Sequence, residues 1–259
     1  MNSASKIFGT NPIVFSGALY PKPLNARSRD DDDFDFSRCC SDWFSTHFAR
    51  QAYTQTRLDQ KIGVIDVHLV KDIMRSHMLG KEFTPAKGSM RDICMHAGPI
   101  TRPSQTASSY IGQLFEKVPI HWFTATSTPC ISIYKPVFME SGLPDLKLTP
   151  EKLYDVKSIW WTHERLNRRM IGSFKEYFPK IRKQIETVEA NFHPRAEELR
   201  SSFLNGEVSM EDLRNLTNRA FAKSLEIEIT LIDEVKPKPS NPVFYLYWRK
   251  MNSEAKIQL

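Results

Sequence analysis

The sequence lacks the short motifs by which many enzymes are recognised. It contains no Gly-x-Ser-x-Gly turn of a serine hydrolase, and no loop ends in the Gly-Lys-Ser or Gly-Lys-Thr of a phosphate-binding site. His163 and Glu164 resemble the start of a zinc-protease helix, but Asn167 occupies the place of the second histidine. The sequence therefore carries no common signature of a serine hydrolase, of a phosphate-binding loop or of a zinc protease.

Cysteine is scarce, and its spacing is equally uninformative. The four cysteines are Cys39, Cys40, Cys94 and Cys130, and none belongs to a Cys-x-x-Cys pair, which favours reduced thiols over a disulfide framework. The seven histidines include no pair at the close spacing of a metal site on one helix or hairpin. The spacing therefore predicts neither a metal nor a cofactor.

Long apolar runs are missing as well, and no basic stripe is present. No stretch approaches the length of a membrane span, and the first residues lack the apolar core of a signal peptide, so we expect no membrane span and a cytoplasmic location. The net charge is +6, but Lys and Arg alternate with Asp and Glu, so nucleic acid is not predicted as a partner. The acidic run at 30–33 lacks the spacing and the glycine of a calcium loop, and we interpret it as a solvated loop.

The sequence does contain four short β-branched and aromatic runs near its centre, each of strand length. Dipeptides that contain proline separate them. Because proline cannot donate to a sheet ladder, these points are interpreted as turns, and the runs predict an antiparallel meander. The runs are residues 93–95, 109–111, 120–123 and 131–134.

Helical periodicity flanks these runs on both sides. Helices followed by strands and then by further helices are typical of an α+β fold. Asp66 and Ser209 are predicted as N-caps. The predicted helices cover residues 37–55, 65–78, 151–171, 178–192 (ending before Pro194) and 209–233. We divide the chain into an extended lead-in (1–33), an α+β core with an antiparallel sheet (34–149), a helical region (150–235), and a linker with a closing segment (236–259).

Cys94 and His96 are candidates for a thiol–imidazole pair. In an extended strand, two residues that are two positions apart share a face, so the pair is geometrically possible. The alternative is that Cys94 is a small buried hydrophobic residue, and we favour it because such cysteines are commoner than catalytic ones.

Cys130 lies at the mouth of a predicted turn and is the third weak catalytic candidate. Thr124, Thr126 and Ser127 precede it and offer hydroxyl groups that would suit a substrate. Threonine and serine at a strand end are also ordinary capping residues, so both interpretations stay open.

Several strings resemble the secernin family, a branch of the dipeptidase-like N-terminal-nucleophile hydrolases. These strings are CMHAG at 94–98, RPSQTASSYIGQL at 102–114 and HWFTATSTPCISIYKPVF at 121–138. FDFSRCCSDW, WWTHERLNRR and LYWRKMN also look like family elements. The resemblance covers nearly the whole chain from about Phe34 onward.

The resemblance implies the C-terminal portion of a four-layer αββα sandwich with one incomplete sheet. In the family, the nucleophile is a cysteine at the mature N-terminus, ahead of the region that this chain resembles, so no catalytic residue is carried over. The implied function is a cysteine-type dipeptidase that hydrolyses small peptides or amides through an acyl-enzyme, without cofactor, and that is inactive until the missing half is supplied.

Two alternatives remain open beside this one. In the first, the chain is a non-catalytic secernin-like interaction module that is linked to secretion. In the second, the coding sequence extends upstream of Met1. If a sheet layer is missing, we expect an apolar face that includes some of Tyr110, Trp122 and Ile133 to be exposed, or to be covered by a partner chain or a second copy.

Overall fold

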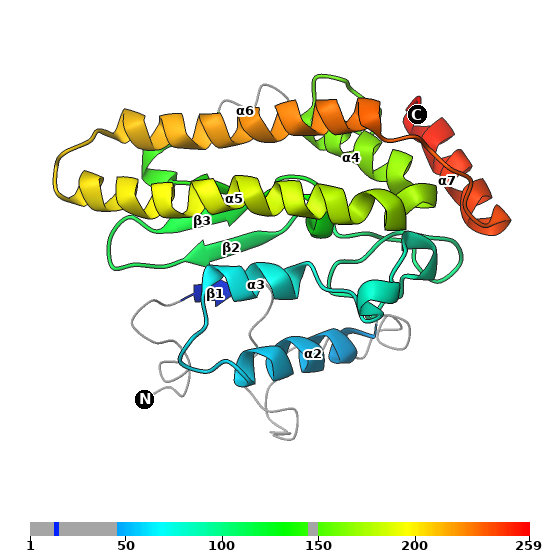
Figure 1. Ribbon diagram of the computed structural model, residues 1–259, viewed down its shortest axis with the longest axis horizontal. Helices are drawn as coiled ribbons and strands as arrows, with labels where there is room; N and C mark the ends of the chain where they lie inside the picture. Colours follow the sequence, from blue (N-terminus) through cyan, green and yellow to red (C-terminus); the bar gives the residue numbers. More distant parts are fainter. Residues whose placement is uncertain (1–12, 16–45, 145–149) are drawn as a thin grey trace, which may run out of the picture.

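The computed structural model describes residues 13–15, 46–144 and 150–259, and in them an antiparallel sheet packs against long helices (Figure 1). The four strands lie in the order β1-β2-β3-β4, and each pairs antiparallel with the next. They are β1 (Ile13–Phe15), β2 (Tyr110–Gln113), β3 (Ile120–Phe123) and β4 (Lys135–Val137). The register sets Ile111 opposite Trp122, and Trp122 opposite Pro136, on one face of the sheet.

The helices of the described residues fall into two groups along the chain. Helices α2 and α3 lie between β1 and β2, and α4 to α7 follow β4. They are α2 (His47–Asp59), α3 (Val67–Met74), α4 (Ile159–Met170), α5 (Phe174–Leu204), α6 (Met210–Glu234) and α7 (Pro242–Ala255). Short 3-10 turns are η3 (Gly80–Glu82), η4 (Pro85–Lys87), η5 (Pro129–Ile131), η6 (Met139–Ser141) and η7 (Ile171–Ser173).

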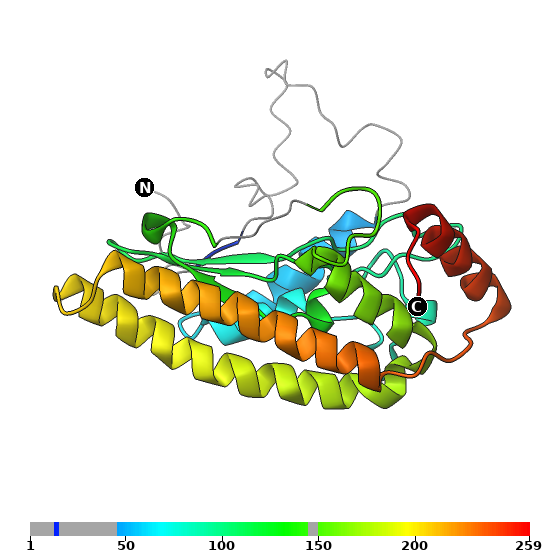
Figure 2. The ribbon, with the colours of Figure 1, turned by 90° about the horizontal axis from the view of Figure 1, so that it is seen from above.

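Helices α5 and α6 run side by side and cover one face of the sheet (Figures 1 and 2). The sheet residues on that face, Ile111, Ile120 and Trp122, are buried in one cluster with Leu199 of α5 and Leu213 of α6. The fold is therefore α+β, as predicted, because one apolar sheet face and two amphipathic helices bury each other.

A second cluster continues the core beyond the end of the sheet. It unites Cys94, Cys130 and Ile133 with Leu166 of α4 and Leu231 of α6. Both clusters join residues before position 149 to residues after 150, so the long helices complete the core that the sheet begins.

Two of the four predicted strands form and two do not. Strands β2 and β3 overlap the runs at 109–111 and 120–123. The run at 93–95 is a loop, because the Cys94 amide donates to Ser76 O (3.1 Å) and Met95 pairs with Thr106 rather than with a strand. In the run at 131–134, Ile131 ends η5, residues 132–134 have no regular secondary structure, and β4 begins only at Lys135.

The predicted caps are confirmed, whereas several predicted helix bounds are wrong, most of all the start of α4 and the end of α5. The Asp66 carboxylate accepts from the Leu69 amide (2.7 Å), and Ser209 forms a capping box with Asp212. Helix α4 begins after Ser158 rather than near Thr149. Helix α5 continues through Pro194 to Leu204, since the buried residues that follow the proline hold it against the sheet despite the lost hydrogen bond.

Of the three residues from which an exposed or partner-covered face was expected, Trp122 and Ile133 are instead covered within the chain. Trp122 and Ile133 are 0% and 2% exposed, because α5 and α6 of the same chain cover them. Tyr110 lies on the opposite face and is half-buried. The predictions for Cys39, Cys40 and the acidic run lie outside the described residues.

The last helix, α7, forms the closing segment after the proline-rich linker and packs Phe244 and Trp248 inward. Among the described residues, no helix combines the length and the apolar character that a bilayer crossing requires.

A buried cluster of cysteine and histidine

Three of the sequence candidates, Cys94, His96 and Cys130, meet in the core, and His77 joins them. The four residues come from three separate stretches of chain. His77 follows the end of α3, Cys94 and His96 lie in the loop between η4 and β2, and Cys130 belongs to η5. The pairing of Cys94 with His96 on one side of an extended stretch is thus part of a larger group.

The side-chain distances in this cluster are short. His96 Nε2 lies 3.7 Å from Cys94 Sγ, 3.4 Å from Cys130 Sγ and 3.3 Å from His77 Nε2. One donor atom from each residue lies within 4.8 Å of all the others. Cys94, Cys130 and His96 are at most 3% exposed, so this is an interior site.

Arg75 positions the stretch that carries Cys130. Its guanidinium donates from Nε to Pro129 O (3.0 Å) and from a terminal nitrogen to Ser132 O (2.7 Å), so it brackets η5 from both ends. Glu189 of α5 fixes this guanidinium through two hydrogen bonds of 3.1 and 2.6 Å. A charged clamp between the C-terminal end of α3 and α5 therefore sets the position of the Cys130 thiol.

The two thiols have opposite pKa shifts. Burial raises the pKa of Cys94, but hydrogen bonds from Cys130, His77 and His96 outweigh burial and hold that pKa well below its usual range. Burial raises the pKa of Cys130, and the neighbouring Cys94 raises it further. The cluster therefore favours one thiolate beside one thiol.

The hydroxyl residues proposed for substrate binding are buried. Thr124, Thr126 and Ser127 are all 0% exposed. Thr124 Oγ1 donates to Thr126 O (3.0 Å), and Ser127 Oγ donates to Glu164 Oε2 (2.6 Å). This arrangement favours the capping interpretation, because the hydroxyls brace the turn that leads into η5.

A second polar group, which sequence reasoning missed, connects Ser132, His163 and Glu228. Ser132 Oγ lies 3.1 Å from His163 Nε2, and His163 Nδ1 lies 2.9 Å from Glu228 Oε1. This is the connectivity of a serine–histidine–acid triad. Ser132 and His163 are both 0% exposed, so the hydroxyl does not meet a substrate in this structure. Since 31 and 65 residues separate the partners, no local spacing signals the group.

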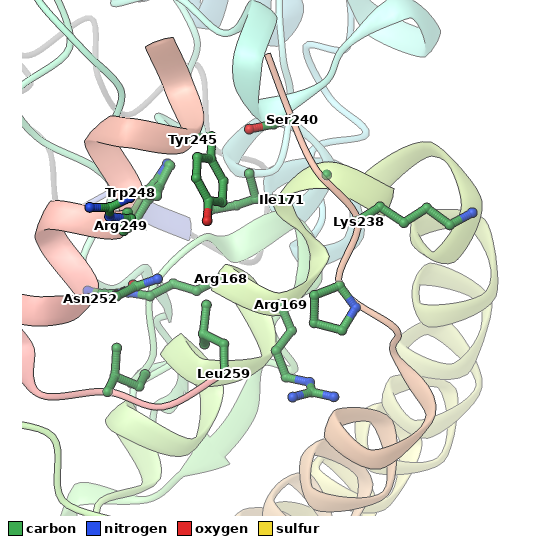
Figure 3. A pocket seen from close by; sticks show the side chains of 13 residues that line it. Arg168, Arg169, Ile171, Lys238, Ser240, Tyr245, Trp248, Arg249, Asn252 and Leu259 are labelled. Carbon is green, nitrogen blue, oxygen red and sulfur yellow. Dashed lines mark hydrogen bonds between the residues drawn. The ribbon is translucent and has the colours of Figure 1, made fainter. Parts of the chain in front are cut away.

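A solvent-facing cavity lies elsewhere, between α4, α7 and the linker before α7 (Figure 3). Its volume is about 290 Å³, and no residue of the cysteine and histidine cluster lines it. Arg168, Arg169, Lys238 and Arg249 give it a basic lining. It is therefore a surface feature separate from the thiols.

Comparison with known proteins assigns no role to these residues. No protein-family model matches the chain, and no curated protein matches it. Any functional interpretation of the chain therefore rests on the geometry of its described residues.

Proposed function

We propose that this chain is the C-terminal portion of a secernin-like, dipeptidase-like cysteine amidohydrolase that acts on dipeptides or other small amides in the cytoplasm. The packing of α5 and α6 on one face of an antiparallel sheet supports this proposal. Such a pair of layers corresponds to half of an αββα sandwich. In the proposed complete unit, a second sheet packs on the opposite face of β2 and β3, and a second helical layer lies beyond it.

The observation that carries the proposal is the character of this opposite sheet face. Tyr110, His121 and Phe123 share it and are only half-buried. The Tyr110 and Phe123 rings stack with centroids 4.7 Å apart, and Tyr110 Oη lies 2.8 Å from His121 Nδ1. A half-buried surface of three aromatic rings is suited to a further layer of protein.

In this proposal, the working thiol comes from a nucleophile-bearing segment and not from the cysteines of the core. Cys94 and Cys130 are 0% and 1% exposed and cannot reach a peptide. A cysteine at a chain start uses its own α-amino group as the base for its thiol. The thiolate attacks the substrate's amide carbonyl and expels the amine of the substrate, and water then hydrolyses the acyl-enzyme. The present chain would supply the sheet and helices against which that segment is positioned.

A second candidate function, a non-catalytic interaction module, is favoured by α7. This helix exposes Val243, Tyr245 and Leu246 at 58%, 51% and 57%. Apolar side chains that gather on one exposed helix are typical of a surface that binds another protein. In this alternative, a partner chain or a second copy covers α7.

Dipeptide hydrolysis separates the two candidates. We expect no turnover by the chain alone, and turnover when it is produced together with a nucleophile-bearing segment that begins with cysteine. Substitution of that leading cysteine by alanine should abolish the activity. Two results would contradict the proposal. The first is turnover by the chain alone that is lost in Cys94→Ala, and the second is a folded complex of the chain with the segment that shows no turnover.

A further inference from the structure

His96 Nε2 has more close polar neighbours than its hydrogen-bonding capacity allows. The nitrogen faces His77 Nε2, Cys94 Sγ and Cys130 Sγ at 3.3, 3.7 and 3.4 Å. An imidazole nitrogen either donates one hydrogen or accepts through one lone pair, so it satisfies one of these three partners at a time. Ordinary hydrogen bonding therefore does not explain why all four side chains converge.

A shared metal ion does explain the convergence, because the three separations from His96 Nε2 match tetrahedral coordination. With zinc–nitrogen bonds of about 2.0–2.1 Å and zinc–sulfur bonds of about 2.3 Å, tetrahedral geometry places two nitrogens about 3.3 Å apart and a nitrogen and a sulfur about 3.6 Å apart. The cluster has 3.3 Å between its two nitrogens, and 3.4 and 3.7 Å from His96 Nε2 to the two sulfurs.

The donor set selects the metal. Two thiolates and two imidazoles are the ligands of tetrahedral structural zinc sites, whereas magnesium and calcium prefer oxygen. All four positions of the tetrahedron come from protein side chains. A site closed in this way has no position for substrate, which is the property that distinguishes structural from catalytic zinc.

We propose that His77, Cys94, His96 and Cys130 bind one zinc ion that cross-links the core of this protein. Each thiol gives its proton to solvent and forms a sulfur–zinc bond, and each histidine coordinates through a neutral nitrogen. The two thiolates balance the double charge of the ion, so the buried site becomes neutral and no oxidation state changes.

The surroundings of the four residues suit a buried ion. The His77 ring stacks on Phe83 with centroids 3.5 Å apart, and the rings of Phe83 and Phe174 lie 5.0 and 6.0 Å from the His96 ring. These aromatic side chains form an apolar wall, which keeps water from competing for the ion.

The location also gives the ion a structural task. Between α3 and β2, residues 75–109 contain only the short turns η3 and η4 as helical elements. Stretches of this length with little regular structure are uncommon inside a compact fold unless something holds them. An ion bound by His77, Cys94, His96 and Cys130 ties this stretch at two points to η5. The inference is independent of the proposed amidohydrolase function.

Metal analysis of the full chain tests the inference. Protein purified without chelator should contain about one zinc per chain by mass spectrometry of the elements. After replacement of zinc by cobalt, the absorption spectrum should show the strong visible bands of a tetrahedral site and thiolate-to-cobalt charge transfer. Cys130→Ser should lower the zinc content at least tenfold at equal total zinc, while Cys39→Ser with Cys40→Ser should leave it unchanged.

A second variant, in which one metal-binding side chain replaces another, keeps the test decisive even if Cys130→Ser fails to fold. His77 is the least buried of the four residues, and His77→Cys preserves four donors while adding a third thiolate. We expect charge-transfer intensity per cobalt to increase by about half. Three results would overturn the inference: folded protein that binds neither zinc nor cobalt, a disulfide between Cys94 and Cys130 in the purified protein, or zinc that remains bound in Cys130→Ser.

Discussion

Glu189 of α5 is the carboxylate that pairs with two buried cations, Lys71 and Arg75. It receives two hydrogen bonds from Arg75 and one from the Tyr134 amide (2.6 Å), and Lys71 Nζ lies 3.5 Å away. Burial raises the pKa of Glu189, but the charges of Arg75 and Lys71 outweigh burial and lower that pKa to about 2. Burial, followed by the charge of Lys71, lowers the pKa of His193 to about 2, so this neighbour is neutral.

The lowered pKa of Glu189 predicts how acid destabilises the protein. A carboxyl group with a depressed folded-state pKa stabilises the fold above its unfolded value of 4.5, and this contribution is lost as the pH falls from about 4.5 to about 2. Glu189→Gln should reduce the free energy of unfolding by about 3 kcal/mol at pH 6, because Arg75 stays buried without its partner. It should also make the free energy of unfolding depend less on pH below pH 4.5. Urea unfolding at pH 6 and pH 3 measures both effects.

Glu186→Gln is the matched control for this prediction. Glu186 lies one turn before Glu189 in α5, and its side chain is 58% exposed beside Arg182. Exposed ion pairs contribute about 0–1 kcal/mol, so we expect a small change with no altered pH dependence. Equal effects of the two substitutions would refute the special role of Glu189.

At this scale, sequence reasoning named three of the four cluster residues, Cys94, His96 and Cys130, but it paired only Cys94 with His96 and missed His77. Cys94 and His96 are two residues apart, so their pairing is visible in the sequence. His77 and Cys130 are 19 and 34 residues from His96, and only the packing of α3, the loop before β2 and η5 brings them together. A search for ligands within one helix or hairpin cannot detect a site of this kind.

Helix α5 shows how an element departs from its local signals. Pro194 predicts a helix end, yet the helix spans Phe174–Leu204. Ala196 and Leu199 after the proline are buried against the sheet, and this packing outweighs one missing hydrogen bond. The caps at Asp66 and Ser209 were predictable because they depend on residues three positions away, whereas the extent of α5 depends on contacts with distant residues.

Replacing the proline should stabilise the helix. Pro194→Ala restores the amide donor and removes the ring that crowds the preceding turn, so we expect the free energy of unfolding to rise by about 1–3 kcal/mol. Arg195→Ala, at the next and exposed position, should change it by less than about 0.5 kcal/mol. A loss of stability in Pro194→Ala would show that the ring itself packs in the fold, and thermal denaturation followed by circular dichroism measures both variants.

At the scale of the whole molecule, substitution of two neighbouring residues in β3 tests which layer packs on each face of the sheet. Trp122 faces α5 and α6 and is fully buried, while Phe123 lies half-buried on the opposite face. Trp122→Ala should cost about 3–5 kcal/mol and unfold a marginal protein. Phe123→Ala should cost the chain alone about 1 kcal/mol. In the proposed complete amidohydrolase unit, the Phe123 variant should lose dipeptide turnover, and full turnover there would contradict the proposed second sheet on this face.

Sequence reasoning predicted the fold class but not which sheet face would be covered. Buried and half-buried residues alternate along β3, yet this pattern does not say which layer packs on which side. Trp122 was one of three residues of which some were expected to be exposed or covered by a partner, but α5 and α6, which lie far beyond β3 in the same chain, return to cover it.

X-ray absorption at the zinc edge is the most direct test for a zinc ion held by two cysteines and two histidines in the core. We expect two sulfur neighbours at about 2.3 Å and two nitrogen neighbours at about 2.0–2.1 Å around each ion, in protein with about one zinc per chain. A shell of oxygen and nitrogen without sulfur, or protein that carries no zinc while fully folded, would contradict the zinc site.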